Sequence, residues 1–318
     1  MDENVLITSI GSFSTDSVVK SLKEAFRGQI IGCDIYPSEW HSTSELFDIV
    51  LKSPMVKEKT AFYNFIREVC NKYSIGFIVP LMDFDIDFFN EQRNYFTSNG
   101  IIVTIPSKKS LDIIRDKHKV YEYFKQDNLV KPISTYSLKD ISIDMSYPLL
   151  AKPKYGRSSK GIHIVSSESD LNDNYYADNY IFQQIIQGQI CSVDYVRSET
   201  TGRDYYICRR ELLRTSHGAG MTIQTFKSEK LGHVVSYIGK SCGINGCINF
   251  EFIEQDKEYH LMDINPRFSA GIGFSKLAGY DFVKSHINCF IGKDILPGVD
   301  YQDFIAEKKM IEVINKVL

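Results

Sequence analysis

The stretch YHLMDINPRFSAG, residues 259–271, places polar side chains at every second position near the end of an apolar run. Asp263, Asn265 and Arg267 alternate with other residues, and Pro266 interrupts the run. Because alternate side chains of a β-strand lie on the same face, a strand here would direct an acid, an amide and a guanidinium group into one space. The sequence therefore predicts a polar site at the end of this strand.

The residues just upstream predict the partner strand of a hairpin. Residues 247–267 contain two alternating runs separated by the turn EQDKE, a pattern typical of an antiparallel pair. Glu251 should then lie close to Asp263 and Asn265, and two carboxylates with an amide oxygen form the hard-oxygen set that suits Mg²⁺. The spacing equally allows an alternative in which Asp263 pairs with Arg267 and Glu251 faces water.

A second candidate site surrounds the run AKPKYGRSSKG, residues 151–161. Lys152 lies in an apolar strand, where a lysine needs an anionic partner. The loop that follows carries glycines and serines whose backbone N–H groups and hydroxyls could wrap phosphates. It is not a Walker loop, because no Gly-Lys-Ser/Thr follows, and an ordinary flexible hairpin loop is the alternative. Lys117, early in a predicted helix, is a further cation that would otherwise be solvated.

The first third of the chain predicts a parallel sheet with helices on both faces, because short apolar runs alternate with helical patterns. The strands are expected at 4–11, 29–37, 75–83 and 100–107, and the helices at 16–26 and 60–73. The first turn, GSFSTDS, lacks the G-x-G-x-x-G fingerprint, so we predict a Rossmann-like scaffold rather than a dinucleotide site. Asp83, Asp85 and Asp87 are expected to form a solvated acidic cluster at a helix N-terminus, with contact to a ligand at the C-terminal edge of the sheet as the alternative.

The remaining elements mix helices with a β-rich region that needs antiparallel pairing. One long helix is expected over 110–132, with Ser110 as its cap and Pro132 after its end. Two strands should flank the glycine and serine loop within 147–167. Further strands are expected at 180–186, 189–196 and 204–213, and further helices at 231–244 and 277–292.

Composition narrows the class of protein and its partners. The chain has 318 residues, of which 43% are hydrophobic and 24% charged, and a formal net charge of -3, so no global basic field would attract nucleic acid. The seven cysteines include no C-x-x-C pair and are expected to be reduced, buried thiols. The acidic N-terminus does not have the pattern of a signal peptide, and no apolar run is long enough to span a membrane. We therefore expect a cytoplasmic protein.

Together these motifs resemble the ATP-grasp enzymes. Lys117 in RDKHK, Lys152 in LLAKP, then YGRSSKG, FQQIIQGQICSVD and NFEF with LMDINPRFSAG occur in the order found in that family. The N-terminal third looks like the pre-ATP-grasp domain of the carbamoyl-phosphate synthase large-subunit type. The resemblance implies an α/β Rossmann-like domain followed by an α+β ATP-grasp fold of two β-rich subdomains. The expected units are 1–110 for the pre-ATP-grasp domain, 111–186 for a linker helix and small lid subdomain, and 187–318 for a C-terminal subdomain with the magnesium site.

The resemblance also implies which residues bind ATP. Lys117 and Lys152 would bind its phosphates, and the loop 155–161 would close over them through Tyr155, Gly156, Ser158, Ser159 and Gly161. Backbone groups would meet the adenine at Gln183, Gln184, Ile185 and Ile186, between apolar walls formed by Leu150 and Ile253. Gln184, Gln189 and Ile190 stand where acids are common in the family, which leaves the ribose contacts open.

The same resemblance implies the metal site and the reaction. Glu251, Asp263 and Asn265 match magnesium ligands, with Mn²⁺ as an option, although glutamate is commoner than aspartate at position 263. Arg267 matches an arginine that steadies the transferred phosphoryl group. The implied reaction is an ADP-forming ligation of a small-molecule carboxylate to an amine, or to a thiol, through an acyl phosphate. The alternatives are carbamoyl-phosphate-synthase-like phosphoryl transfer to a small carboxylate or carbamate, and a non-catalytic ATP-binding protein. No nucleic acid or membrane partner is expected, and a homodimer stays open.

The carboxylate substrate should lie beyond the γ-phosphate, and residues 209–222, RRELLRTSHGAGMT, are the candidate region. Arg210 and Arg214 fall on the same face of an expected strand, where either could clamp a carboxylate bidentately. Surface arginines on a strand edge are the alternative. Residues 214–222 form a candidate substrate flap with glycine hinges, and His217 within it is a weaker candidate for a general base.

Overall fold

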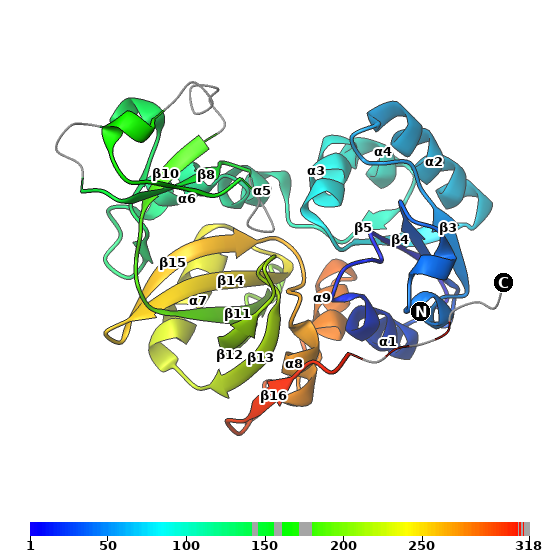
Figure 1. Cartoon of the computed structure of the whole chain (residues 1–318). Coiled ribbons are helices and arrows are strands. Elements are labelled where there is room, and N and C mark those ends of the chain that lie inside the picture. The colour runs from blue at the N-terminus through cyan, green and yellow to red at the C-terminus, as the bar shows by residue number, and fades with distance from the viewer. Residues whose placement is uncertain (142–145, 156–160, 172–179, 311, 313, 315–318) are drawn as a thin grey trace.

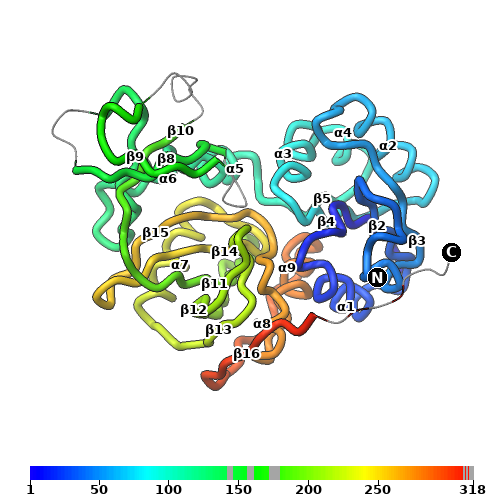
Figure 2. Tube along the Cα trace, in the orientation of Figure 1, coloured from blue at the N-terminus to red at the C-terminus, as the bar shows by residue number. Residues whose placement is uncertain are grey.

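The computed structural model describes residues 1–141, 146–155, 161–171, 180–310, 312 and 314. These residues form three lobes, which we call the N-terminal lobe, the small lobe and the large lobe, and each is built around one β-sheet (Figure 1). The chain leaves the N-terminal lobe through two short helices, enters the small lobe and then continues into the large lobe (Figure 2). The predicted order of an α/β domain followed by two β-rich units is confirmed.

The N-terminal lobe contains a five-stranded sheet in the order β3-β2-β1-β4-β5, with every neighbouring pair parallel. Its strands are β1 Asn4–Thr8, β2 Ile30–Asp34, β3 Ile49–Lys52, β4 Ile75–Pro80 and β5 Ile102–Val103. Its helices are α1 Thr15–Ala25, α2 Lys59–Lys72, α3 Asp83–Glu91 and α4 Arg93–Ser98. The sequence prediction missed strand β3, because this strand has only four residues and none of them is fully buried.

Alternation along β1 explains how helices cover both faces of this sheet. Val5 and Ile7 pack with the apolar side of α1, whereas Leu6 belongs to the cluster formed with α2 and α3. A parallel strand covered on both faces is apolar at nearly every position, and β1 is indeed buried from its second residue onward.

The long helix expected over 110–132 is wrong, since the chain forms two helices there. α5 spans Lys108–Ile114 and α6 spans Lys117–Phe124. The carboxylate of Asp116 accepts the N–H groups of His118 and Lys119 at 3.0 and 3.1 Å and so caps a new helix start. Ser107, rather than Ser110, caps α5, and Pro132 lies in the short strand β6, Lys131–Pro132.

The small lobe is a four-stranded sheet in the order β7-β10-β8-β9. Its strands are β7 Thr135–Tyr136, β8 Leu149–Pro153, β9 His163–Val165 and β10 Tyr180–Gln184, and the pairs β7–β10, β10–β8 and β8–β9 are antiparallel. Leu149, Ala151, Val165 and Phe182 form its buried centre. The two strands predicted to flank the glycine and serine loop are therefore confirmed.

The large lobe is a seven-stranded sheet in the order β16-β13-β12-β11-β14-β15-β6. Its strands are β11 Gln189–Arg197, β12 Asp204–Arg214, β13 Gly220–Phe226, β14 Gly246–Gln255, β15 Glu258–Asn265 and β16 Ile305–Glu307, together with β6. Its helices are α7 Glu229–Ser241, α8 Ile272–Leu277 and α9 Phe282–Phe290. Single turns of 3-10 helix occur at Ser38–Trp40, Ser44–Leu46, Leu138–Asp140 and Glu168–Asp170.

Two broader expectations concern the cysteines and membrane-spanning helices. All seven cysteines are free and buried, as predicted. Within the described part of the chain, no helix is long and apolar enough to cross a bilayer.

Candidate active site

The hairpin of β14 and β15 carries the central part of the site. Glu251 lies opposite Asp263, and Asn249 lies opposite Asn265. All four side chains line one cavity of about 1220 Å³. The predicted hairpin is confirmed, and it brings the three proposed magnesium ligands together; their role as ligands stays a prediction.

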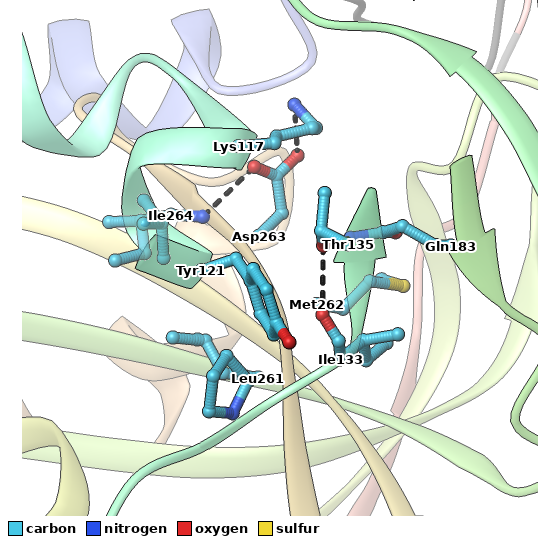
Figure 3. Close-up of a pocket in the computed structure, with 11 residues that line it drawn as sticks. Lys117, Tyr121, Ile133, Thr135, Gln183, Leu261, Met262, Asp263 and Ile264 are labelled. Carbon is cyan, nitrogen blue, oxygen red and sulfur yellow. Dashed lines mark hydrogen bonds and ion pairs between the residues drawn. The ribbon is translucent and has the colours of Figure 1, made fainter. Parts of the chain in front are cut away.

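Asp263 is paired with a lysine from α6. The Lys117 Nζ atom lies 3.0 Å from Asp263 Oδ2, and the Ile264 N–H donates to Asp263 Oδ1 at 3.0 Å (Figure 3). The alternative of an Asp263–Arg267 pair is therefore wrong. Because Lys117 is the first residue of α6, the helix break at Asp116 places its ammonium group over the hairpin.

Glu251 is a partly buried carboxylate held by an arginine. The Arg214 Nη2 atom donates to Glu251 Oε1 at 2.6 Å, so Glu251 does not simply face water. Burial raises the pKa of Glu251, Arg214 opposes this shift, and the like charge of Asp263 adds to it. Two carboxylates that repel one another in a closed space favour a bound cation.

The donor set fits a hard divalent ion. Glu251 and Asp263 offer carboxylate oxygens, while Asn265 and Asn249 offer amide oxygens from the paired positions. Among the described residues, no group of three or more His, Cys, Asp and Glu side chains gathers as a metal cluster, so this site would rely on two carboxylates, amides and ligand oxygens. That composition matches Mg²⁺, which keeps few protein ligands and takes the rest from water and phosphate.

Lys152 supplies a second cation on the cavity wall. Its residue is only 7% exposed on β8, and it lines the cavity beside Leu150. Burial lowers the pKa of Lys152 to about 8, although Asp263 acts in the opposite direction. A phosphate placed here would stabilise the charged lysine, as the sequence prediction requires.

The four residues predicted to meet adenine do not line the large cavity, and their contact with adenine stays a prediction. The Gln183 side chain donates to Thr135 Oγ1 at 2.7 Å and lines a separate small pocket beside Asp263 (Figure 3). The Gln184 N–H donates to Ser134 O at 3.3 Å. Strand β10 ends at Gln184, so the prediction that Ile185 and Ile186 belong to this strand is wrong. These two residues follow the strand.

The apolar walls differ from the prediction on one side. Leu150 lines the cavity as expected, but Ile253 does not. Its cross-strand neighbour Ile190 takes that place, together with Met262 of β15. In the sequence, Ile190 was only a departure from the family pattern. The alternation of side chains along a strand cannot show which of two paired residues lines the cavity.

The glycine and serine loop can be assessed only at its two ends. Gly156, Ser158 and Ser159 lie outside the described residues. Tyr155 is 54% exposed and has the ammonium group of Lys154 5.9 Å from its ring centre. Tyr155 and Gly161 do not line the cavity, whereas Ile162 does. Their contact with a nucleotide stays a prediction.

Arg267 is held by an acid from the N-terminal lobe. Its Nε donates to Asp83 Oδ2 at 3.1 Å, and its Nη2 donates to Asn265 Oδ1 at 3.3 Å. Asp83 Oδ1 accepts from Arg115 Nη1 at 3.2 Å. Burial opposes ionisation of Asp83, but Arg267 and Arg115 outweigh it and lower its pKa to about 2.

The expectation of a solvated acidic cluster is therefore wrong for two of its three members. Asp83 is 2% exposed and Asp85 is 1% exposed, whereas Asp87 is half-exposed and paired with Arg115. For Asp83, the prediction lacked its partner arginines Arg115 and Arg267, which lie 32 and 184 residues away in the sequence. Among the described residues Asp85 has no arginine partner, and it accepts from a threonine hydroxyl at the end of β1.

The predicted carboxylate clamp is half wrong. Arg214 lines the cavity, but Arg210 points to the other face of the sheet, where it pairs with Glu254 at 2.8 Å and covers the Phe226 ring. The register shifts around Leu213 change which face the following residue occupies. An expectation of strict alternation could not include this bulge.

Arg209 occupies the cavity face in place of Arg210. It is fully buried and donates to Asp194, Glu211, Ser192 and Ser269. A Cβ atom on Gly271 would come within 3.0 Å of its guanidinium group, so glycine allows the turn after β15 to approach this close. With its donors occupied by the protein, Arg209 stabilises the cavity floor.

The predicted flap over 214–222 is smaller than expected. Arg214 ends β12 and residues 220–222 begin β13, so only 215–219 connect the strands. The Thr215 N–H donates to Ala219 O at 2.8 Å and closes a tight turn. His217 lines the cavity, and its Nδ1 lies 3.2 Å from Ser216 Oγ.

The cavity also extends into the N-terminal lobe, which the sequence analysis treated as a scaffold. Its lining there includes Gly11, Asp34, Met82 and Asp85, which follow the carboxyl ends of parallel strands. Ligands of open parallel sheets bind at this edge, so the strand ends were the available signal.

Comparison with protein families assigns two segments of the chain. The model of the ATP-grasp domain matches residues 114–271, and the model of the PylC-like N-terminal domain matches residues 5–104. The carbamoyl phosphate synthase large chain of Thermoanaerobacter sp. (strain X514) is 24% identical over 220 residues, which is 62% of this chain and 20% of that protein. The chain thus matches only about a fifth of the length of this relative.

Solved structures give the same architecture. The biotin carboxylase domain of Hydrogenobacter thermophilus 2-oxoglutarate carboxylase, in complex with MgADP and bicarbonate, has a TM-score of 0.76 and 17% identity, covering 93% of this chain and 71% of that one. L-amino acid ligase from Bacillus licheniformis has a TM-score of 0.69 and 13% identity, covering 90% and 73%. At these identities the likeness shows the fold alone.

Proposed function

Because this chain belongs to the ATP-grasp family, with a PylC-like domain before its ATP-grasp domain, we propose that it is an ADP-forming ligase that joins a carboxylate to an amine. One observation carries the proposal. The oxygen ligands of the hairpin, the cations Lys117, Lys152, Arg214 and Arg267, and the strand ends of the N-terminal lobe all line one cavity. That cavity has room for a nucleotide and further substrates.

The charged residues of the cavity have different proposed roles. A divalent ion held by Glu251, Asp263 and Asn265 would neutralise negative charge on the phosphates of ATP. Lys152 offers its ammonium group to the same phosphates, and Lys117 steadies Asp263 while adding positive charge nearby. Positioning and charge neutralisation of this kind are what phosphoryl transfer requires of a protein.

The proposed reaction needs no side-chain nucleophile. A carboxylate oxygen of the substrate attacks the γ-phosphorus of ATP, and the bond to ADP breaks. The amine then attacks the acyl carbon of the resulting acyl phosphate and loses a proton. Inorganic phosphate leaves with the former carboxylate oxygen. Arg267, fixed by Asp83, is placed to stabilise the phosphoryl group, and Arg214 to orient the substrate carboxylate.

An alternative acceptor is suggested by the relatives. The Hydrogenobacter domain was solved with bicarbonate, and the Thermoanaerobacter relative is a carbamoyl phosphate synthase chain. A bicarbonate or carbamate acceptor would use the same phosphoryl transfer, so it differs from the ligase proposal only in which acid stimulates ADP release.

The test is ADP release in the presence of Mg·ATP across a matrix of carboxylates, with bicarbonate among them, against a panel of amines. We expect ADP release that requires one carboxylate and one amine together. Lys152→Ala serves as the inactive variant, and Lys139→Ala, an exposed lysine of the small lobe, as the matched control. Stimulation by bicarbonate alone would favour the alternative acceptor, and ATP binding without acid-dependent ADP release would contradict both.

A further inference from the structure

The N-terminal lobe has a crevice where its strand order reverses. From β1 the chain builds β2 and β3 on one side, and then β4 and β5 on the other. The strand ends beside this switch point, at Ser9 after β1 and Met82 after β4, line the large cavity. In open parallel sheets this is the place where ligands bind. Here it opens into the same space as the metal and phosphate side of the site.

A buried carboxylate in this crevice lacks a full set of partners. Asp85 lines the cavity and is 1% exposed. Its Oδ2 accepts the Thr8 hydroxyl at 2.8 Å. Ser9 and the Met82 backbone also act on this carboxyl group and lower its pKa, but within the described residues no group lies in good hydrogen-bond geometry to Oδ1. Burial raises the pKa of Asp85 to about 6, and the neighbouring charge of Asp34 adds to the rise. A cationic ligand would supply what this carboxylate lacks.

Apolar side chains line the same cavity as this acid and are partly exposed. Phe13, Tyr36, Met55 and Phe84 line the cavity, and each is more than a third exposed. Tyr36 stacks on Trp40, with ring centres 5.5 Å apart, which stiffens this wall. Large apolar side chains that gather in a concave surface, next to one convergent polar group, are typical of a small-molecule site.

The charges of the cavity are divided between its two sides. The ATP-grasp side presents Lys117, Lys152, Arg214 and Arg267, which suit ATP and a carboxylate. The side in the N-terminal lobe presents Asp34 and Asp85, with Lys57 also on its lining. Asp34 is committed to the Gly11 and Tyr36 N–H groups, at 2.9 and 3.3 Å, so Asp85 is the better placed acid.

We propose that this crevice binds the amine substrate, with its ammonium group paired to Asp85 and an apolar or aromatic body against Phe13, Tyr36, Met55 and Phe84. The role of the bound amine as a substrate rests on the proposed ligase function. The binding of an amine in this crevice does not depend on that function. This proposal restricts the amine substrate of the ligase to primary amines that carry a sizeable apolar group. Small amines such as ammonia leave the apolar wall uncovered.

Binding can be measured without catalysis by titration calorimetry with two matched probes. 2-Phenylethylammonium carries the charge, and 2-phenylethanol has the same ring and chain without it. We expect the cation to bind at least about tenfold more tightly than the alcohol. Asp85→Asn should remove this difference, and Phe84→Ala should weaken both probes. Glu91→Gln, an exposed acid on the same helix, is the matched control and should change neither.

Each outcome bears on one proposal. Equal affinity for the two probes in the wild type, or a preference that survives in a folded Asp85→Asn protein, overturns the amine site. Because Phe84 is exposed, its alanine variant should fold even if Asp85→Asn does not, and unchanged binding there also contradicts the site. If the probes bind as expected but no carboxylate supports ADP release, the ligase proposal fails and the amine site stands.

Discussion

Asp263 has three neighbours that bear on its charge. Lys117 contacts the Asp263 carboxylate at 3.0 Å, and Glu251 lies opposite on β14. Lys152 is near enough for the charge of Asp263 to raise the pKa of this lysine. Lys117 neutralises part of the repulsion between the two acids, and a divalent ion would neutralise more. Asp263 therefore contacts a lysine of the protein at the position where we also propose a divalent ion.

Asp263→Asn removes a proposed carboxylate ligand and the ion pair between Asp263 and Lys117. We expect ADP turnover to fall by roughly two to three orders of magnitude, because charge stabilisation of the transferred phosphoryl group is lost. Turnover should be measured against Mg²⁺ and Mn²⁺ concentration, with the thermal midpoint as the check on folding. A variant with near wild-type turnover would remove Asp263 from the metal site.

At this scale the sequence could predict groupings that arise from local alternation. Glu251, Asp263 and Asn265 were found because a hairpin brings them together whatever the rest of the fold does. Asp83 was misjudged because its partner Arg267 comes from another lobe, and Asp85 because it packs against the end of β1 within its own lobe. Asp83 and Arg267 are 184 residues apart in the sequence, and no periodic pattern connects them.

Elements depart from the prediction where one residue changes a local pattern. Asp116 starts a new helix and splits the expected 110–132 helix, and the bulge around Leu213 moves Arg214 to the cavity face while Arg210 stays on the other. The periodicity of 3.6 or 2 residues predicted that these elements exist, but caps and bulges decide where they end and which face they show.

The packing of α9 on β14 depends on a neutral histidine. His286 Nδ1 accepts the Cys247 N–H at 2.8 Å, and the ring lies between those of Phe268 and Phe290. Burial lowers the pKa of His286 from 6.5 to about 3. Below pH 6.5 the unfolded chain binds a proton that the folded protein does not, so stability is present above that pH and is lost as the pH falls toward 3.

We predict that the free energy of unfolding falls by up to about 1.4 kcal/mol per pH unit from this residue alone across that window. His286→Gln should be less stable at pH 7.5 and should show a shallower decline between pH 6.5 and 4.5. Urea unfolding at a series of pH values measures both. His233→Gln, at an exposed position of α7, is the control, and equal slopes in all three proteins would exclude His286 as the source.

Across the whole molecule, the residues that follow β15 are held by contacts from other parts of the chain. Asp83 of α3 holds Arg267, and Lys308 donates to Ala270 O at 2.6 Å and to Phe13 O at 3.3 Å. The turn that carries Arg267 is thus fixed from both the N-terminal lobe and the segment after β16. An account based on the hairpin alone would omit this support.

Asp83→Asn should leave the fold and nucleotide binding largely intact but lower kcat by about 10- to 100-fold, since Arg267 loses the partner that orients it. The readout is the split between kcat and the Kd for ADP, because a purely structural defect would weaken both. Asp87→Asn, which keeps the Asp83–Arg267 contact, should have a smaller effect. An unchanged kcat in Asp83→Asn would show that Arg267 needs no help from the N-terminal lobe.

The most direct test of the central proposal follows the oxygen atoms of the carboxylate. With the acid and amine identified by ADP release, the carboxylate is labelled with ¹⁸O, and the inorganic phosphate is analysed by mass spectrometry. Activation through an acyl phosphate predicts one ¹⁸O atom in each phosphate formed. Phosphate that carries no label, at the same rate of ADP release, would contradict the ligase mechanism.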